Sequence, residues 1–141
     1  MSRLARVFLD PAYAIALSAI TDQYHVKAEA LAAQMIRDRT SIVTTRAVML
    51  EVGNALGKER FRAAGIALLD ALERDPGVEI VPLDEELFAR AFRLYRTRPD
   101  KEWGLIDCVS FVAMQDREIG AALTPDDHFV QAGFRALMRE V

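Results

Sequence analysis

The chain has 141 residues, 52% of them hydrophobic, which is enough to bury a core and excludes a disordered chain. It carries 18 basic and 21 acidic residues, and its net charge of −3 argues against a nucleic-acid partner unless several acids are committed to a cation. The single cysteine, Cys108, excludes an internal disulfide and a cysteine-built zinc cage, and it is typical of a reducing compartment.

The chain shows no signal for a membrane or for export. No apolar run approaches the ~20 residues that a membrane-spanning helix needs. The apolar run near the N-terminus ends at Asp10, which makes it too short for a signal peptide, and no small-residue cleavage site follows. We therefore expect one cytoplasmic domain over residues 1–141, without a membrane partner.

Short β-type runs alternate with longer helical patterns along the chain. Strands are predicted at 6–9, 41–44, 78–81 and 121–124, with a terminal edge strand at 134–141. Helices are predicted at 12–20, 22–37, 45–56, 58–74, 84–96 and 105–117. This order favours an α/β fold, with a mostly parallel central sheet of four to five strands flanked by helices.

The second predicted helix, over residues 22–37, has an apolar face. Asp22 is expected to cap it. Its inward face is expected to carry Val26, Ala30, Ala33 and either Met35 or Ile36.

Two acids follow predicted strands. Asp10 comes directly after the first strand, and Asp126 lies two residues beyond the strand over 121–124. Because the carboxyl ends of parallel strands lie at one edge of a sheet, we expect both carboxylates at the edge where sites form in such folds.

Two further acids interrupt apolar helical stretches. Glu51 lies within the run over 49–56, and Asp107 lies within the run over 103–111. A carboxylate in an apolar run is costly unless it is paired, hydrogen-bonded or bound to a cation. Four acids at one edge would repel each other unless a divalent cation lay between them, and oxygen ligands suit Mg²⁺ or Mn²⁺.

Each acid also has a purely structural explanation. Asp10 could cap a helix that begins at Pro11, and Asp126 could cap the turn that follows it. Glu51 could be solvated, and Asp107 could pair with an arginine. The joint pattern, with two acids at strand ends and two in apolar helices, favours a metal site.

The blocks around these acids resemble, in order and spacing, those of PIN-domain proteins of the VapC toxin type, from bacterial type II toxin–antitoxin systems. The blocks are 8–10 with 13–17, 44–45 with Glu51 and 54–56, 103–111 with Met114, and 122–124 with Asp126, 128–129 and 132–134. The resemblance covers nearly the whole chain. One departure is Pro11, where the family often has Thr or Ser directly after the first Asp.

The resemblance implies a Mg²⁺- or Mn²⁺-dependent endoribonuclease, usually a homodimer, held inactive by a cognate antitoxin. Its metal-binding acids would be Asp10, Glu51, Asp107 and Asp126. Asp10 and Asp107 are the expected direct ligands, Asp126 would bind directly or through water, and Glu51 would orient or deprotonate the attacking water. The products would carry a 5′-phosphate and a 3′-hydroxyl. The candidate donors to these carboxylates are Thr124 and Ser110, which could equally be ordinary structural hydroxyls.

The histidines and the cysteine are predicted to be structural. His25 is expected in a capping turn. His128 is expected to pack locally beside Phe129 and Phe134, and the alternative is that, as a neighbour of Asp126, it faces the site. Cys108 is expected to be a small buried residue, because no base is positioned to activate it.

Other functions fit the sequence less well. A haloacid-dehalogenase-like phosphatase needs a second Asp two residues after the first, where this chain has Ala12. A receiver domain needs an acidic pair before the first helix and a late strand-end lysine. The remaining alternative is a catalytically weak or inactive PIN-fold module that binds RNA or a partner protein, with Pro11 as a sign of decay.

Overall fold

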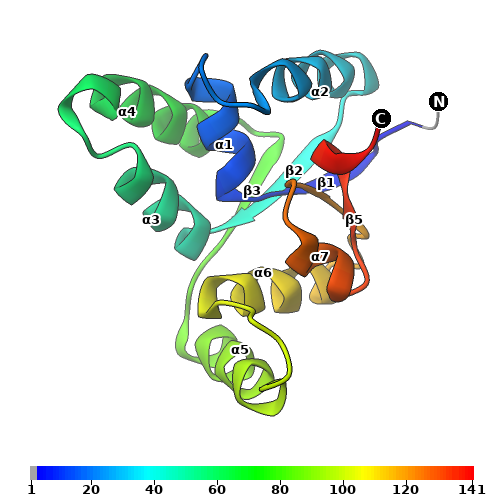
Figure 1. Cartoon of the computed structure of the whole chain (residues 1–141). Coiled ribbons are helices and arrows are strands. Elements are labelled where there is room, and N and C mark those ends of the chain that lie inside the picture. Colours follow the sequence, from blue (N-terminus) through cyan, green and yellow to red (C-terminus); the bar gives the residue numbers. More distant parts are fainter. Residues whose placement is uncertain (1–2) are drawn as a thin grey trace.

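The computed structural model describes residues 3–141, in which five parallel strands form one sheet with helices on both faces (Figure 1). The strands are β1 at Arg6–Leu9, β2 at Ser41–Thr45, β3 at Val78–Val81, β4 at Ala121–Leu123 and β5 at Arg135–Ala136. The helices are α1 at Pro11–Ser18, α2 at His25–Asp38, α3 at Arg46–Ala55, α4 at Glu59–Arg74, α5 at Glu85–Thr97, α6 at Leu105–Asp116 and α7 at Asp127–Gln131, followed by the 3₁₀ turn η1 at Leu137–Arg139. The predicted α/β class is confirmed.

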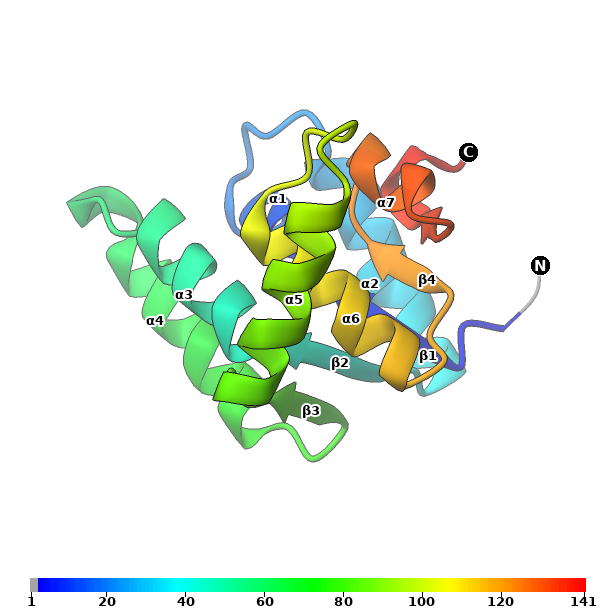
Figure 2. The same cartoon turned by 90° about the horizontal axis from the view of Figure 1, so that it is seen from below.

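The strand order β3-β2-β1-β4-β5 reverses direction beside β1. Helices α1, α2 and α4 lie over one face of the sheet, and α5 and α6 lie over the other (Figures 1 and 2). The parallel register pairs Phe8 with Ala122 and Leu9 with Leu123, so β1 and β4 end side by side. Such a reversal of strand order beside the carboxyl ends of two neighbouring strands is where sites form in parallel sheets.

An aromatic cluster fastens α6 to the segment after β4. The ring centroid of Phe111 lies 5.1 Å from that of Trp103, 5.0 Å from Phe129 and 5.7 Å from Phe134. Trp103 and Phe129 are buried with it. The cluster therefore sets the spacing between the start of α6 and the start of α7, and each of these positions carries a predicted site acid.

The expectations for α2 are wrong in two respects. The helix begins at His25, because the Asp22 carboxylate caps an earlier turn by accepting from the Tyr24 amide at 2.8 Å. Of the expected inward face, Val26 is 77% exposed, Ala30, Ala33 and Ile36 also face solvent, and only Met35, the named alternative to Ile36, reaches the core. The residues that face the core are Ala28, Leu31 and Met35. Apolar side chains recur at helical spacing on more than one face of α2, so spacing alone does not identify the face that packs against the core.

The C-terminal segment also differs from the prediction. Only Arg135–Ala136 of the expected strand over 134–141 pairs with the sheet, because β4 itself is three residues long. The chain then turns, and the Met138 amide donates to the Thr124 carbonyl at 3.1 Å. The short helix α7 was not predicted. No helix in the described range is both long and apolar enough to cross a bilayer.

We predict that Phe111→Ala lowers the free energy of unfolding by about 3–5 kcal/mol, because it removes the ring at the centre of the aromatic cluster. Urea denaturation monitored by circular dichroism measures this loss. Leu50→Ala, at a side chain that is 64% exposed, is the matched control and should cost less than about 0.5 kcal/mol. Equal losses in the two variants would contradict the role given to the cluster.

Candidate metal centre

Asp10 lies at the junction between β1 and α1. Its carboxylate caps α1, accepting from the Ala12 amide at 3.4 Å, and Pro11 occupies the first helical position. This confirms the capping arrangement that the sequence offered as a structural alternative. The side chain is only 8% exposed, so the cap alone leaves a carboxylate in a poorly hydrated place.

Thr124 connects the end of β4 to Asp10. Its buried hydroxyl donates to Oδ2 of Asp10 at 3.0 Å. The Thr124 hydroxyl oxygen in turn accepts from the backbone amide of Asp126 at 3.1 Å. One hydroxyl therefore orients the Asp10 carboxylate and holds the turn that carries Asp126, which fits its expected role as a donor. The other candidate donor, Ser110, has a buried hydroxyl without a hydrogen-bond partner within residues 3–141.

Asp107, Asp126 and His128 converge from two elements. Asp107 lies in the first turn of α6, where its carboxylate accepts from the Gly104 amide at 3.1 Å. Asp126 caps α7 by accepting from the His128 amide at 2.8 Å. Nδ1 of His128 lies 3.1 Å from Oδ2 of Asp107 and 3.5 Å from Oδ1 of Asp126. One ligand atom from each of the three side chains lies within 4.8 Å of the others.

Asp10 and Glu51 are not part of this group of three. Glu51 projects from α3 and is exposed, which agrees with the solvated alternative for its position. The negative charge of Asp107 nevertheless raises the pKa of Glu51, after burial as the larger cause. The structure thus brings three of the predicted acids close together and leaves Glu51 at the rim of the site. Asp10 and Asp126 follow the carboxyl ends of β1 and β4, and Asp107 lies in the first turn of α6.

The carboxylates destabilise each other's charged forms. Burial raises the pKa of Asp10 to about 7, against the opposing hydrogen bonds from Thr124 and Ala12, and the charges of Asp107 and Glu51 add to the rise. Burial is also the main cause that raises the pKa of Asp107, which the neighbouring Asp126 charge raises further. His128 and the Gly104 amide act in the opposite direction on Asp107.

A divalent cation fits this set of donors. Protein carboxylates crowded in a poorly hydrated place become stable as anions when a cation lies among them. The distances of 3.1 Å and 3.5 Å from Nδ1 of His128 to the two carboxylate oxygens also suit adjacent ligands on one ion at metal–ligand distances of roughly 2.1 Å. Carboxylate oxygens with one imidazole nitrogen are ligands that Mn²⁺ accepts, and the carboxylates alone suit Mg²⁺.

For His128 the sequence favoured local packing over a place in the site, and the structure supports the alternative. Its neighbour Phe129 is buried as expected, but the imidazole points to the two acids. The signal that could have identified it is the short cap Asp126-Asp127-His128, which begins a helix directly after a strand at the predicted site edge.

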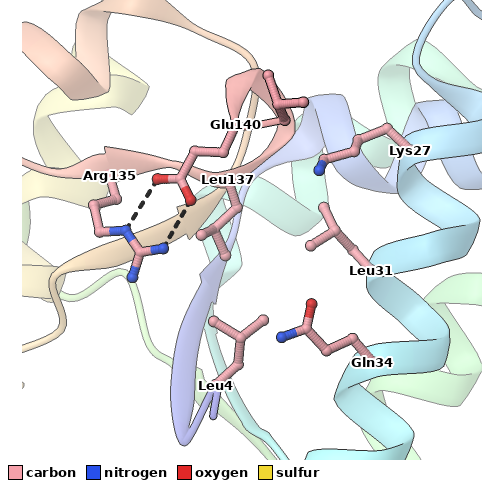
Figure 3. Close-up of a pocket in the computed structure, with 8 residues that line it drawn as sticks. Leu4, Lys27, Leu31, Gln34, Arg135, Leu137 and Glu140 are labelled. Atoms are coloured by element: carbon pink, nitrogen blue, oxygen red, sulfur yellow. Dashed lines mark hydrogen bonds and ion pairs between the residues drawn. The ribbon is translucent and has the colours of Figure 1, made fainter. Parts of the chain in front are cut away.

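A separate hollow of about 250 Å³ lies between α2 and the C-terminal segment (Figure 3). Leu4, Leu31 and Leu137 form its apolar floor. At its rim the Arg135 guanidinium pairs with Glu140 at 2.7 Å, which neutralises both charges. None of the predicted site acids lines it, so the hollow and the acidic site are different places.

Comparison with known families decides the classification. A family model for the PIN domain matches residues 7–135. The chain belongs to the PIN-domain family. The matched range contains all four predicted acids, and the family expected from the sequence blocks is confirmed. No curated protein matches the chain.

Two solved structures share the PIN fold of this chain. VapC20 of Mycobacterium tuberculosis, a toxin that cleaves the sarcin–ricin loop, is 23% identical with a TM-score of 0.81, and the match covers 91% of this chain and 95% of that one. VapBC2 of Rickettsia felis, bound to a DNA fragment from its promoter, is 12% identical with a TM-score of 0.63, and the match covers 93% and 96%. At these identities the similarity establishes the fold.

We predict that Asp10 makes the metal-free protein less stable as pH rises. Its pKa of about 7 exceeds the ordinary 3.8, so between these values the folded chain keeps a proton that the unfolded chain loses. Folding stability therefore falls as pH rises through this window. With a chelator present, thermal unfolding of the wild type should lose several degrees from about pH 4 to about pH 7 more than that of Asp10→Asn. Parallel pH profiles for the two proteins would refute this.

Proposed function

We propose that this PIN-domain protein is a Mg²⁺- or Mn²⁺-dependent endoribonuclease and the toxin of a type II toxin–antitoxin system. The observation that carries the proposal is the convergence of Asp107, Asp126 and His128 beside the buried Asp10 carboxylate. The fold shared with VapC20, a sarcin–ricin-loop-cleaving toxin, supports RNA as the substrate. The fold shared with VapBC2 supports an antitoxin as a partner.

The cation would be held by Asp107, Asp126 and His128. Asp10 would add a further carboxylate beside it. When bound, the cation would polarise a phosphoryl oxygen and lower the pKa of a water molecule. Thr124 keeps the Asp10 carboxylate in one orientation through its hydrogen bond at 3.0 Å. This orientation matters because ligand groups that are already fixed do not have to be reordered when the substrate arrives.

Glu51 is suited to a different task at the rim. Its raised pKa lets it accept a proton at a higher pH than an ordinary glutamate would. From the exposed side of α3 it would orient the attacking water and take its proton. Attack by water on phosphorus needs no 2′-hydroxyl. If the 3′-oxygen is the leaving group, as the family resemblance implies, the bond between phosphorus and that oxygen breaks and the products carry a 5′-phosphate and a 3′-hydroxyl.

The partners follow from the same function. The protein would act in the cytoplasm, where a cognate antitoxin would cover the acidic site until it is removed. We further propose that the chain forms a homodimer. The exposed rings of Phe88, Phe92 and Tyr95 contact one another along α5, and contiguous exposed apolar surface commonly marks a protein interface.

We predict that the purified protein cuts a mixed RNA pool with Mg²⁺ or Mn²⁺ and stops when a chelator is added. The rate of cutting should fall at least about 100-fold in each of three variants, because each removes negative charge from the cation site. These variants are Asp10→Asn, Asp107→Asn and Asp126→Asn. Gel analysis of labelled RNA measures the rate, and end-group mapping should find 5′-phosphates.

Asp127→Asn is the matched control for Asp126→Asn. Asp127 is the next residue, and it is exposed and paired with Arg139 at 3.0 Å instead of facing the site. Its variant should cut at nearly the wild-type rate. Undiminished cutting by Asp10→Asn would refute the assignment, and no cutting with any divalent metal would favour an inactive binding module.

We predict that expression of the chain alone slows growth of a bacterial host and that co-expression of its antitoxin restores growth. The Asp107→Asn variant should not slow growth, because it lacks the cation site. Colony counts after induction measure the effect. Equal growth inhibition by the wild type and Asp107→Asn would show that toxicity does not come from the nuclease site.

A further inference from the structure

The turn between α3 and α4 lies on the same side of the sheet as the metal centre. Helix α3 leaves the carboxyl end of β2, and the chain returns through α4 to the amino end of β3. Figure 2 shows the two helices projecting from the body of the protein, with their connecting turn at the far end. The other end of α4, at Arg74, lies close to the opposite edge of the sheet.

One exposed face of α3 leads from the metal centre to this turn. Glu51 lies at the rim of the centre, where the charge of Asp107 contributes to raising its pKa. Asn54 and Ala55 follow Glu51 at helical spacing and are exposed, and Lys58 lies beyond them. A polymer that leaves the centre beside Glu51 therefore reaches the turn within about 10 Å along the helix axis.

The turn carries three basic side chains, Lys58, Arg60 and Arg62, with Glu59 among them. All three are exposed, and within residues 3–141 none of them forms an ion pair. Three bases against one acid give the turn a charge of +2 on a protein whose net charge is −3. An open surface hollow of about 580 Å³ is lined by Lys58, Glu59 and Arg60.

The two arginines of the turn are held in place by their neighbours. The Arg60 guanidinium lies over the Phe61 ring, 4.7 Å from its centroid, and Phe61 packs against the core. Nη2 of Arg62 donates to the Gly57 carbonyl at 2.7 Å. A guanidinium that is already positioned loses less conformational freedom when it binds a phosphate group.

We propose that the turn between α3 and α4 binds phosphates of the RNA substrate on one side of the bond that is cut. The inference rests on the proposed ribonuclease function and adds the path of the substrate over the surface. The strand would pass from the metal centre along the exposed face of α3 to Lys58, Arg60 and Arg62. Contacts to phosphates position a nucleic acid without reading its bases, so the turn contributes affinity and alignment and not sequence preference.

The position of the turn favours an RNA backbone over an acidic protein segment. An RNA that is cut at the metal centre has to continue across the neighbouring surface, and it carries one negative charge on every nucleotide. An acidic protein segment would be attracted by the same bases, but on the path to the centre its carboxylates would meet Glu51 and Asp107. RNA brings to the centre a phosphate, which is the group that the centre is proposed to bind.

RNA binding by the Asp10→Asn protein tests the inference without cleavage. Fluorescence anisotropy of a labelled single-stranded RNA of mixed sequence, at constant Mg²⁺ and several salt concentrations, gives Kd and its salt dependence. Lys58→Ala and Arg60→Ala should each raise Kd about threefold or more. Each should also reduce the slope of log affinity against log salt by about 0.7, the value for one lost phosphate contact on a single strand. Lys58→Arg keeps the charge and should bind as tightly as the parent.

Arg74→Ala is the matched control. Arg74 is exposed at the other end of the same helix, and within residues 3–141 it forms no ion pair. Its loss changes the net charge by the same amount, and it should alter Kd less than about twofold and leave the salt slope in place. Equal losses in Arg74→Ala and Arg60→Ala would show an effect of net charge alone and would overturn the inference.

Further outcomes separate the turn from the nuclease assignment. In the wild-type background, Lys58→Ala and Arg60→Ala should act mainly on KM for RNA cleavage, because their contacts are remote from the reacting phosphorus. Metal-dependent cutting combined with unchanged RNA binding by these variants would overturn the role of the turn and leave the nuclease in place. Binding that depends on the turn without any cutting would support the turn and refute the nuclease.

Two results would count against RNA at the turn. If the Asp10→Asn protein binds no RNA and the wild type cuts none, the turn and the nuclease assignment both fail. If Lys58→Ala and Arg60→Ala bind RNA normally but are no longer neutralised by the co-expressed antitoxin, the turn serves the protein partner, and the RNA inference fails.

Discussion

The parallel pairing of β1 with β4 is the constraint on which the site depends. The two strands share only the pairs Phe8 with Ala122 and Leu9 with Leu123, yet this register brings Asp10 and Thr124 within one hydrogen bond of each other. The Thr124 hydroxyl also accepts from the Asp126 amide and so fixes the turn that carries the Asp126 carboxylate. A slip of one residue between these strands would turn the side chains of one strand end to the opposite face and separate the acids.

Packing elsewhere in the fold offsets the free-energy cost of placing these acids close together at the junction of β1 and β4. Burial of the charged Asp10 carboxylate opposes folding and is the main cause of its raised pKa, and the charges of Asp107 and Glu51 add to the rise. The aromatic cluster around Phe111 supplies apolar burial beside the site and fixes the start of α6 relative to α7. Destabilisation at the acids is thus balanced by packing one layer away, as is common where binding groups are held in place before a ligand arrives.

The sequence indicated the elements whose signals are local. Alternation of strands and helices predicted the parallel sheet, and the strand-end rule placed Asp10 and Asp126 at one edge before any contact was known. His128 was assigned to packing because its role depends on α7, a five-residue helix too short to show a period. The inward face of α2 was misassigned because alanines on several sides of that helix fit either orientation. Glu51 shows a third difficulty, since an acid in an apolar run can still lie on the solvent side, and only tertiary contacts decide.

Pro11 gives the entrance of the site a particular character. A helix N-terminus usually offers several free amides to an anion, but proline has no amide hydrogen, and the Ala12 amide already donates to Asp10. The backbone at this junction is consequently a weak phosphate receptor. Under the proposed function, the negative side chains would repel an incoming nucleic acid as long as no cation is bound. The ion would then have to bind before the polymer, and the supply of the ion would control when the polymer can bind.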